Sequence, residues 1–585
     1  GDVMMDRTVD IHHAPPSEPA SSKKLKRKKE VPVVQPAAVA FQQGTGILLN
    51  MNDQTKKDNL ITSWEHGDME IHMEVMLPKG SNSGIYLQGR YEVQLFDSYQ
   101  QGAAKSSDMG GIYRNWESQQ GKIYMGKAPL ANAAKAPGLW QTLTIAFKAP
   151  RFDSSGNKVS NAEFLEVWLN GVLIHDHVHV PLPTGGAIEN NEVAQGPLMI
   201  HGDHGPVAFR NVRFKHMSEC GVALTNLGYK TYHGDFSSID ELKKRTPNAA
   251  GLLKEITCEV AGLEDGFGIL FNGTIDIPKD DNYTFQVTCY GGAILSVNNQ
   301  TLIAPGLNHE RGVIRLAKGS YPFELLYAKH VSWLPSRLAV FVRTETTYPK
   351  PLHSFGSFPP GSEAVSPIFV HADEPTRLLR AFLDFDNDPG QRLTHTIAVG
   401  DPKGIHYIYD LKAGSMACVW RGEFVDATPM WHDRGDGSYR PRGMVEYLFN
   451  STSLAILNSP DQPFPVVSDE NDFRGKGYTL EPETSQPTFH YVYKGVGVKD
   501  RTMPDATGTE LRRELTFSRV EPGMFFKLGE GRTIRKMPDG SYGIDDQRYY
   551  IKLGSETGVT IRKQGDKQEL LASLTTTSLT YSIIW

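Results

Sequence analysis

The sequence is poor in the features that mark several classes of protein. Four cysteines occur in 585 residues, too few for a scaffold held together by disulfides. No apolar run approaches the roughly 20 residues that a membrane-spanning helix needs. The net charge is only −6, so nothing favours wholesale binding to nucleic acid.

Long helical periodicities are also scarce, whereas glycine (56), proline (36), tyrosine (23) and phenylalanine (26) are plentiful. This composition favours turns and strands and predicts a mainly β protein. The chain is too long for one core, so three or four domains are expected. Because it begins at Gly1 without an initiator methionine, we expect a mature form whose targeting segment has been removed, located in the periplasm or outside the cell.

The four cysteines leave two alternatives open. Cys258 and Cys289 fall on neighbouring predicted strands and could form one bridge in an oxidising compartment. The alternative is that Cys220 and Cys418 are buried free thiols together with these two.

Residues 1–40 lack a core pattern and are interrupted by prolines. They contain a basic run made of Lys23, Lys24, Lys26, Arg27, Lys28 and Lys29. This composition predicts a disordered tether. The alternatives are an arm that binds an acidic partner or an anionic surface, or a nuclear-import signal.

The stretch from Gly84 to Asp97 reads GIYLQGRYEVQLFD and alternates with period two, which predicts a single half-buried strand. Its apolar set is Ile85, Leu87, Tyr91, Val93 and Leu95, and its polar set is Tyr86, Gln88, Arg90, Glu92 and Gln94. The polar set mixes donors, acceptors and charge, which suits a ligand rich in hydroxyl groups. We therefore predict that this strand forms the floor of a sugar site, with a solvated outer face as the alternative.

Strand patterns continue on both sides of this stretch. Met69–Met76 and Trp140–Phe147 alternate, and Asn170-Gly171 predicts a type I′ hairpin turn between two further strands. Many strands of this length without intervening helices predict a β-sandwich or jelly roll.

Several motifs between residues 46 and 217 carry a resemblance. They are PKGSNSGIYLQGRYEVQLFD at 78–97, GGIY at 110–113, WQT at 140–142, APRFD at 149–153, NGV at 170–172 and GDHGPV at 202–207. In order and spacing this region resembles the 3-keto-disaccharide hydrolase domain family. The resemblance implies a concanavalin-like jelly roll and the processing of glycosides that are oxidised at C3 of the sugar.

The polar motif Glu92-x-Gln94-x-x-Asp97 has the spacing of the two-carboxylate motif of β-glucanases, but glutamine and aspartate replace two of its residues. The shorter carboxylate makes a retaining two-carboxylate mechanism doubtful, and Asp97 would need a bulge to face Glu92. A 3-keto sugar permits β-elimination instead, which needs a base, an enolate stabiliser and an acid. Glu92 is the candidate base and His204 the candidate acid.

The remaining candidates surround this pair. Arg90 or a bound cation would stabilise the enolate, and His201, Asp203 and His204 form a candidate site for a divalent metal. Tyr113 and Trp116 could stack on a sugar, or they could belong to a packed loop; His204 could equally be an ordinary loop histidine. The candidate catalytic residues are thus Glu92, His204 and Asp97, and the candidate substrate-binding residues are Arg90, Gln94, Gln88, Tyr113, Trp116, Asp203 and His201.

Residues 219–348 form a second predicted β unit. The segments IPKDDNYTF and LAKGSYPFEL resemble the PA14 module, whose binding members carry paired aspartates after the first of these strands. Tyr290-Gly291 stands at that place, so we expect no calcium, which needs charged oxygen ligands. The module is expected to be structural or to contact a protein.

The predicted domains are a tail at 1–40, a jelly roll at 41–218, the PA14-like sandwich at 219–348, a Pro/Gly/Ser-rich linker at 349–367 and a β-rich domain at 368–585. The last resembles an uncharacterised β-domain that accompanies sugar-processing modules, which assigns no activity. There, Trp420, Trp431 and His432 could form a site, with aromatic core packing as the alternative.

Two hypotheses about function follow. The first is an exported enzyme that cleaves 3-keto-glycosides by hydrolysis or β-elimination. The second is a non-catalytic carbohydrate-binding or structural subunit of an extracytoplasmic assembly. Carbohydrate is the expected ligand, a protein partner or a second copy of the chain is a candidate partner, and neither nucleic acid nor a transmembrane segment is expected.

Overall fold

The computed structural model describes residues 3–5, 41–43, 46–51, 58–99, 104–117, 119–234, 239–306, 310–330, 332–358, 367–432, 434–459, 462–465, 472–545, 548–554 and 558–585. Strands dominate this part of the chain, and its one α-helix, α1 (Thr428–Trp431), has four residues. The prediction of a mainly β protein is confirmed. The chain divides into two compact units, one made of residues 1–214 and 367–585 and the other of residues 215–366.

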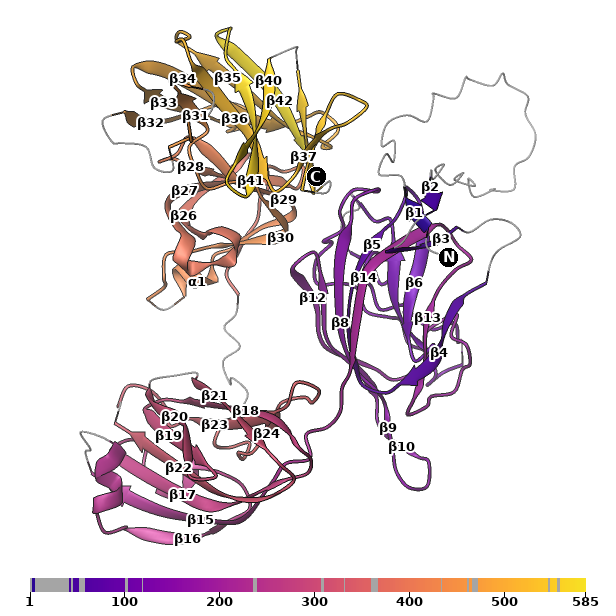
Figure 1. The fold of residues 1–585 in the computed structure, drawn as a ribbon, viewed down its shortest axis with the longest axis vertical. Coiled ribbons are helices and arrows are strands. Elements are labelled where there is room, and N and C mark those ends of the chain that lie inside the picture. The colour runs from indigo at the N-terminus through magenta and orange to yellow at the C-terminus, as the bar shows by residue number, and fades with distance from the viewer. Residues whose placement is uncertain are drawn as a thin grey trace. The chain divides into compact units, whose positions relative to one another are not determined.

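The jelly roll consists of two antiparallel sheets (Figure 1). The six-stranded sheet has the order β12 (Val172–Val180), β11 (Ala162–Leu169), β8 (Gln141–Lys148), β5 (Met69–Met76), β14 (Val207–His216), β3 (Ile47–Asn50). The four-stranded sheet has the order β4 (Leu60–His66), β13 (Gly196–Ile200), β6 (Asn82–Leu87), β7 (Tyr91–Phe96). A two-stranded ribbon, β9 (Arg151–Phe152) with β10 (Lys158–Ser160), lies outside them.

The core of the jelly roll comes from alternate residues of these strands. In β5 the apolar residues Met69, Ile71, Met73 and Val75 are at most 1% exposed, while the polar residues between them are half-buried. Burying one face of each sheet against the other is what the period-two pattern requires.

The predicted single strand from Gly84 to Asp97 is instead a hairpin. Gln88 and Gly89 have φ values of 54° and 65°, and the Arg90 N–H donates to Leu87 O at 3.0 Å, which is the geometry of a type I′ turn. Three residues separate the paired residues Leu87 and Tyr91, so the alternation keeps its phase across the turn. The predicted apolar set therefore does point into the core, and all five of its members are buried.

At the N-terminal end, β1 (Val3–Met5) pairs with β2 (Phe41–Gln43). Of the predicted tail only β1 is described, and the basic run from Lys23 to Lys29 lies outside the described residues. The predicted Asn170-Gly171 turn is confirmed, because both residues have positive φ and join β11 to β12.

The second unit is a sandwich of two antiparallel sheets. One has the order β16 (Ala249–Leu253), β15 (Ala223–His233), β17 (Phe267–Ile277), β22 (Gly319–Lys329), β19 (Gly292–Val297), β20 (Gln300–Gly306). The other has the order β21 (Glu310–Leu316), β18 (Asp281–Cys289), β23 (Leu338–Arg343), β24 (Lys350–Pro351). Two 3-10 helices, η1 (Ile239–Lys244) and η2 (Cys258–Ala261), lie beside the first sheet.

The segment predicted to begin a linker at residue 349 continues this sandwich instead. β24 extends the second sheet, Leu352 is buried, and the Leu352 N–H donates to Val340 O at 2.8 Å. Ser357 is fully buried beside Cys258. The prolines in this segment produce extended backbone, which sequence reading could not distinguish from an exposed linker.

The C-terminal residues form three further sheets. The first contains β25 (Phe369–Val370), β29 (Ser415–Asp426), β28 (Ile405–Asp410), β27 (Arg392–Gly400), β26 (Arg377–Asp384) and β30 (Arg440–Tyr447), with η3 (Phe385–Asn387) and η4 (Pro389–Gln391) between β26 and β27. The second contains β31 (Leu454–Ile456), β36 (Met524–Gly531), β41 (Lys567–Ser573) and β40 (Val559–Gln564). The third contains β32 (Phe473–Leu480), β33 (Pro487–Tyr493), β34 (Val496–Pro504), β35 (Leu511–Phe517), β42 (Ser578–Ile584), β39 (Tyr549–Leu553), β38 (Tyr542–Ile544) and β37 (Ile534–Lys536).

The two tryptophans predicted as part of a site in this region differ in burial. Trp420 is fully buried and its indole N–H donates to Glu423 O and Phe424 O, so the core alternative holds for it. Trp431 is half exposed in α1. All four cysteines are buried and free, so the bridge between Cys258 and Cys289 is not formed.

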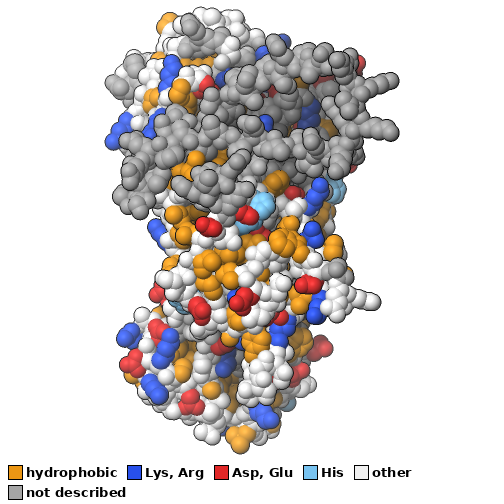
Figure 2. Space-filling view, turned by 90° about the vertical axis from the view of Figure 1, so that its right-hand side faces the viewer, with side chains coloured by type: hydrophobic (Ala, Val, Ile, Leu, Met, Phe, Trp, Pro, Cys, Tyr) orange, Lys and Arg blue, Asp and Glu red, His pale blue; other side chains and the backbone are white. Residues whose placement is uncertain are grey.

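None of the described helices is long and apolar enough to cross a membrane. On the face drawn in Figure 2, acidic and basic side chains are interspersed and hydrophobic side chains gather near the middle. No block of one charge covers the described part of that face.

Candidate functional site

Glu92 lies in the edge strand of the four-stranded sheet of the jelly roll. It belongs to β7 and pairs with Tyr86 of β6, while Gly84 pairs with Gln94. Paired residues share one face of a sheet, so these four residues point away from the core. The Glu92 carboxylate lies directly over Gly84, where an added Cβ atom would collide with it. Glycine at position 84 therefore makes room for the carboxylate.

The environment of Glu92 favours its neutral form. The side chain is 2% exposed, and burial raises its pKa to about 8. Tyr86 lowers this pKa in part, and the charge of Asp203 raises it further. Among the described residues, Oε1 of Glu92 has no hydrogen-bond partner. A carboxyl group with a pKa near neutrality can accept or release a proton under physiological conditions.

Tyr86 lies beside this carboxyl group, because the two residues are paired across β6 and β7. Its hydroxyl donates to Gly185 O at 2.7 Å, and its ring meets the His201 ring edge to face at 6.0 Å. Burial and the Glu92 charge raise the pKa of Tyr86, so the phenol stays protonated beside Glu92. Tyr86 lay on the predicted polar face, but its role depends on the pairing of β6 with β7, which the sequence did not show.

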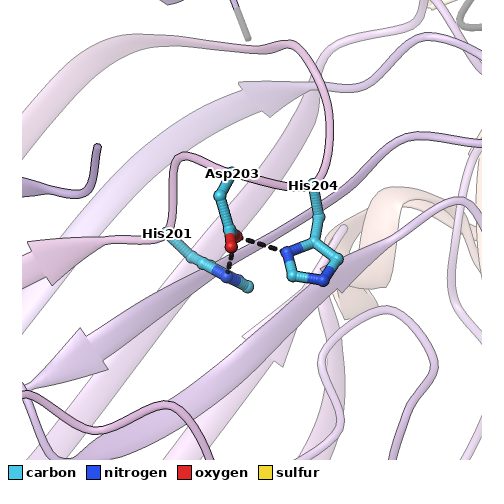
Figure 3. Close-up of side chains that lie close together, drawn as sticks. All are labelled: His201, Asp203 and His204. Carbon is cyan, nitrogen blue, oxygen red and sulfur yellow. Dashed lines mark hydrogen bonds and ion pairs between the residues drawn. The ribbon is translucent and has the colours of Figure 1, made fainter. Parts of the chain in front are cut away.

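His201, Asp203 and His204 form a cluster above Glu92, in the loop between β13 and β14. Figure 3 shows the Asp203 carboxylate between the two imidazole rings. It contacts Nε2 of His201 and Nδ1 of His204, and Nδ1 of His201 lies 3.7 Å from Oε1 of Glu92. The predicted cluster and the candidate base are therefore brought into one site.

The pKa values of His201 and Asp203 depend on the other residues of the cluster. Burial lowers the pKa of His201. The charge of Asp203 opposes this lowering, and the charge of His204 adds to it. Burial would raise the pKa of Asp203, but the hydrogen bond with His204 and the charges of both histidines lower it. The three potential ligand atoms lie within 4.8 Å of one another, so two imidazole nitrogens and one carboxylate oxygen converge, which is a donor set that suits a divalent metal.

The loop that carries the cluster is fixed by the surrounding backbone. The His201 N–H donates to Gly84 O at 2.9 Å, and the Gly202 N–H donates to Asn59 Oδ1 at 3.0 Å. A Cβ atom at Gly202 would collide with the backbone of Asp58. The cluster therefore occupies a defined position relative to the sheet.

An aromatic wall borders the site on the β7 side. Ile112 bridges to Val93, and the Tyr113 N–H donates to Glu92 O at 3.1 Å, so this loop packs along the edge of the sheet. Trp116 is 66% exposed, yet its ring lies against Gly185, where a Cβ atom would collide with it. An indole held by one face and open on the other is suited to stacking on a sugar ring.

Gln94 also remains close to the centre of the site. Its side-chain amide donates to Asn82 Oδ1 at 2.8 Å, which fixes the amide at the edge of the same face. Asn82 was not among the predicted residues, and only the register between β6 and β7 identifies it.

Three predicted site residues have contacts that are structural. Arg90 donates to Asn191 O at 2.6 Å and to Asn191 Oδ1 at 2.8 Å. Gln88 donates to Ala194 O at 2.9 Å. Both residues lie at the hairpin turn and hold the segment 188–195, rather than lining the face that carries Glu92.

Asp97 is the third of these residues. Its carboxylate accepts hydrogen bonds from the Gly80 N–H at 2.8 Å and the Tyr99 N–H at 3.4 Å. No bulge separates it from Glu92, because the β6–β7 register runs unbroken from Leu87–Tyr91 to Asn82–Phe96. Asp97 closes the turn at residues 78–81, and nothing directs it toward Glu92.

Comparison with known proteins finds two domain families along the chain. Residues 24–215 match the 3-keto-alpha-glucoside-1,2-lyase-like domain. Residues 261–351 match the PA14 domain. Both resemblances that the sequence motifs predicted are confirmed, and the matches support a carbohydrate-related protein.

Solved structures give similar alignments over parts of the chain. A protein from Parabacteroides distasonis described as a glycosyl hydrolase aligns at 27% identity and a TM-score of 0.23, over 27% of this chain and 68% of its own. A second such protein from that organism aligns at 19% identity and a TM-score of 0.20, over 29% and 87%. A PA14 sugar-binding domain from an RTX adhesin aligns at 13% identity and a TM-score of 0.17, over 23% and 100%. Among curated proteins no sequence matches the chain.

Proposed function

We propose that the jelly roll cleaves 3-keto-glycosides by β-elimination, with Glu92 as the base. The observation that carries the proposal is the buried Glu92 carboxyl group, whose Oε1 has no hydrogen-bond partner among the described residues and lies 3.7 Å from Nδ1 of His201 in the cluster of His201, Asp203 and His204. The match to the 3-keto-alpha-glucoside-1,2-lyase-like domain supports this substrate class.

The chemistry needs one base and one acid. The C3 ketone acidifies the proton on C2, which the Glu92 carboxylate removes, and the C–H electron pair forms an enolate. As the ketone re-forms, a double bond develops between C1 and C2 and the bond from C1 to the leaving oxygen breaks. His204, whose side chain is 54% exposed, gives a proton to that oxygen. Water adds across the double bond in a later step.

His201, Asp203 and His204 fit a divalent metal as the second component of the site. A metal held by these three residues would supply positive charge that stabilises an enolate. His204 then cannot also be the acid, and the leaving oxygen takes its proton from solvent. Chelation separates the two arrangements: a metal-dependent site loses activity and melting temperature in chelator and regains both with added metal, whereas a metal-free site changes in neither.

The direct test uses 3-keto-glucosides as substrates. Glu92→Gln should lower turnover by about 10²–10⁴-fold, because the amide keeps the shape but cannot accept the C2 proton. Glu65→Gln is the matched control, since Glu65 is an exposed residue of β4 in the same sheet. Full activity of the Glu92→Gln protein would refute the assignment of the base.

Export belongs to the same proposal: the protein acts in the periplasm or outside the cell, alone or with a protein partner or a second copy. The PA14 match supports this location. Cell fractionation followed by detection of the full-length protein tests it, and recovery with cytoplasmic markers alone would refute it.

The second candidate function is a non-catalytic carbohydrate-binding subunit. The structural contacts of Arg90 and Asp97 favour it, because they remove a cation and a carboxylate from the predicted site. Binding of a sugar without product formation, over a range of pH and metal conditions, would select this function over the first.

A further inference from the structure

The free side of β7 is closed by two segments of chain that meet at Glu92. β7 is the last strand of its sheet, so the backbone groups on this side need partners from outside the sheet. The Gln94 N–H donates to Gly111 O at 2.8 Å, and Gln94 O accepts from the Gly110 N–H at 2.8 Å. The carbonyl oxygen of Glu92 accepts from the Tyr113 N–H. The loop of residues 110–113 therefore serves this edge up to the carbonyl group of Glu92.

The N–H group of Glu92 is served by Thr184 instead. The Thr184 N–H donates to Arg90 O at 2.8 Å. The Thr184 hydroxyl accepts from the Glu92 N–H at 3.0 Å and donates to Arg90 O at 3.1 Å. Thr184 and Glu92 are both almost fully buried. Without the hydroxyl, the Glu92 N–H would therefore be a buried donor that has lost its acceptor, which is costly.

The two glycines after Thr184 fit closely against residues that surround Glu92. Gly185 O accepts a hydrogen bond from the hydroxyl of Tyr86, the cross-strand partner of Glu92. A Cβ atom at Gly185 would collide with the Trp116 indole, and one at Gly186 would collide with the Tyr86 hydroxyl. This close packing leaves the segment 184–186 little freedom, so the Thr184 hydroxyl itself is held at a defined place.

We propose that Thr184 is a positioning residue of the jelly-roll site: its hydroxyl fixes the backbone at Glu92 and thereby the direction of the carboxyl group. The inference rests on the proposed function of Glu92 as a base. A base must lie within hydrogen-bond reach of the proton that it removes, and a displacement of about 1 Å can cost on the order of 10²-fold in rate. Because the Thr184 hydroxyl bonds to backbone groups on both sides, it acts through Glu92 and not on the substrate.

The test compares two substitutions in the full chain. Thr184→Val keeps the shape of the side chain and removes the hydroxyl, whereas Thr184→Ser keeps the hydroxyl. With 3-keto-glucosides as substrates, Thr184→Val should lower kcat by roughly 10–100-fold and leave KM within about threefold of the wild-type value. Thr184→Ser should stay within about threefold of wild type in both constants. Thr142→Val is the matched control, because Thr142 is an exposed residue of β8 in the other sheet.

A second measurement follows the hydrogen bond itself. Hydrogen exchange, measured by mass spectrometry on peptides that contain Glu92, should be faster in Thr184→Val than in wild type and unchanged in Thr184→Ser. If the wild-type protein turns over no 3-keto-glucoside, the proposed function fails, and the exchange rates still decide whether the hydroxyl holds Glu92. Melting curves show whether each variant folds. Thr184→Ala removes the same hydroxyl and takes the place of Thr184→Val if that variant does not fold.

Four results would overturn the inference. They are an unchanged kcat in Thr184→Val, equal losses of kcat in Thr184→Val and Thr184→Ser, unchanged exchange at Glu92 in Thr184→Val, and a rise in KM at constant kcat. The last result would mean that Thr184 contributes to substrate binding and not to the placement of the base.

Discussion

Replacing Glu92 with glutamine should remove a pH-dependent loss of stability together with the proposed base. The side chain is buried and its pKa is raised to about 8 from an ordinary value of 4.5, chiefly by burial. A carboxyl group whose pKa is higher in the folded state binds its proton more tightly there than in the unfolded chain. The folded state therefore loses stability as the pH rises from 4.5 toward 8, where the unfolded chain is already ionised.

The size of this effect follows from the two pKa values. At about 1.4 kcal/mol for each pH unit, keeping Glu92 buried costs roughly 3 kcal/mol at pH 7 and about 5 kcal/mol at pH 9. Below pH 4.5 the carboxyl group is neutral in both states and the cost disappears. The amide introduced by Glu92→Gln is neutral at every pH. The free energy of unfolding of this variant, relative to that of the wild-type protein, should therefore increase between pH 4.5 and about 8 and then stay constant.

The assay is urea unfolding of the wild-type protein, Glu92→Gln and the exposed control Glu65→Gln between about pH 4 and pH 9. Chelator is present throughout, so that no metal contributes. The buried amide of Glu92→Gln can lower the free energy of unfolding by an amount that does not depend on pH. The test is therefore how the difference in unfolding free energy between wild type and Glu92→Gln changes with pH. A difference between wild type and Glu92→Gln that stays constant over this range would refute the burial argument, as would the same trend in Glu65→Gln.

Three further predictions address other parts of the chain. His406 is buried, and its pKa is lowered to about 4. Because the unfolded chain binds a proton at this residue more readily, about 3 kcal/mol of stability should be lost as the pH falls from about 6.5 to 4. Melting curves recorded against pH should show a smaller loss for His406→Gln. Gly84→Ala should displace the Glu92 carboxylate and lower turnover without abolishing folding, with a cost of about 1–3 kcal/mol in urea unfolding; wild-type activity would contradict the predicted collision. Asp500→Asn should destabilise the protein by about 3–5 kcal/mol, because it leaves the buried Arg513 guanidinium without its counter-charge; a loss below about 1 kcal/mol in the same assay would contradict this.

Much of the jelly roll was predictable because its strands follow local rules. The alternation in 84–97 identified the buried residues correctly, and Asn170-Gly171 identified its turn, since that pair readily adopts positive φ. The turn at Gln88-Gly89 was missed for a physical reason. The odd number of residues between Leu87 and Tyr91 preserves the phase of the alternation, so a hairpin and a single strand give the same pattern.

The candidate site was predictable in its residue types but not in its partners. Glu92 and the cluster of His201, Asp203 and His204 do meet, although more than a hundred residues separate them. Whether Arg90 lines the site or holds a loop depends on where the segment 188–195 passes. That position is a property of the folded chain, and no local pattern near Arg90 encodes it.

A contrast between two buried carboxylates gives the strongest physical reason to treat Glu92 as functional. Asp500 is fully buried, but Arg513 donates to it from Nε at 2.9 Å and the Tyr409 hydroxyl donates to it at 2.9 Å. Its charge is thus matched inside the fold, as a structural ion pair requires. Glu92 is equally inaccessible, yet one of its oxygens has no hydrogen-bond partner among the described residues, and burial raises its pKa. A buried carboxyl group without a counter-charge lowers stability. What it offers in return is the ability to exchange a proton near neutral pH.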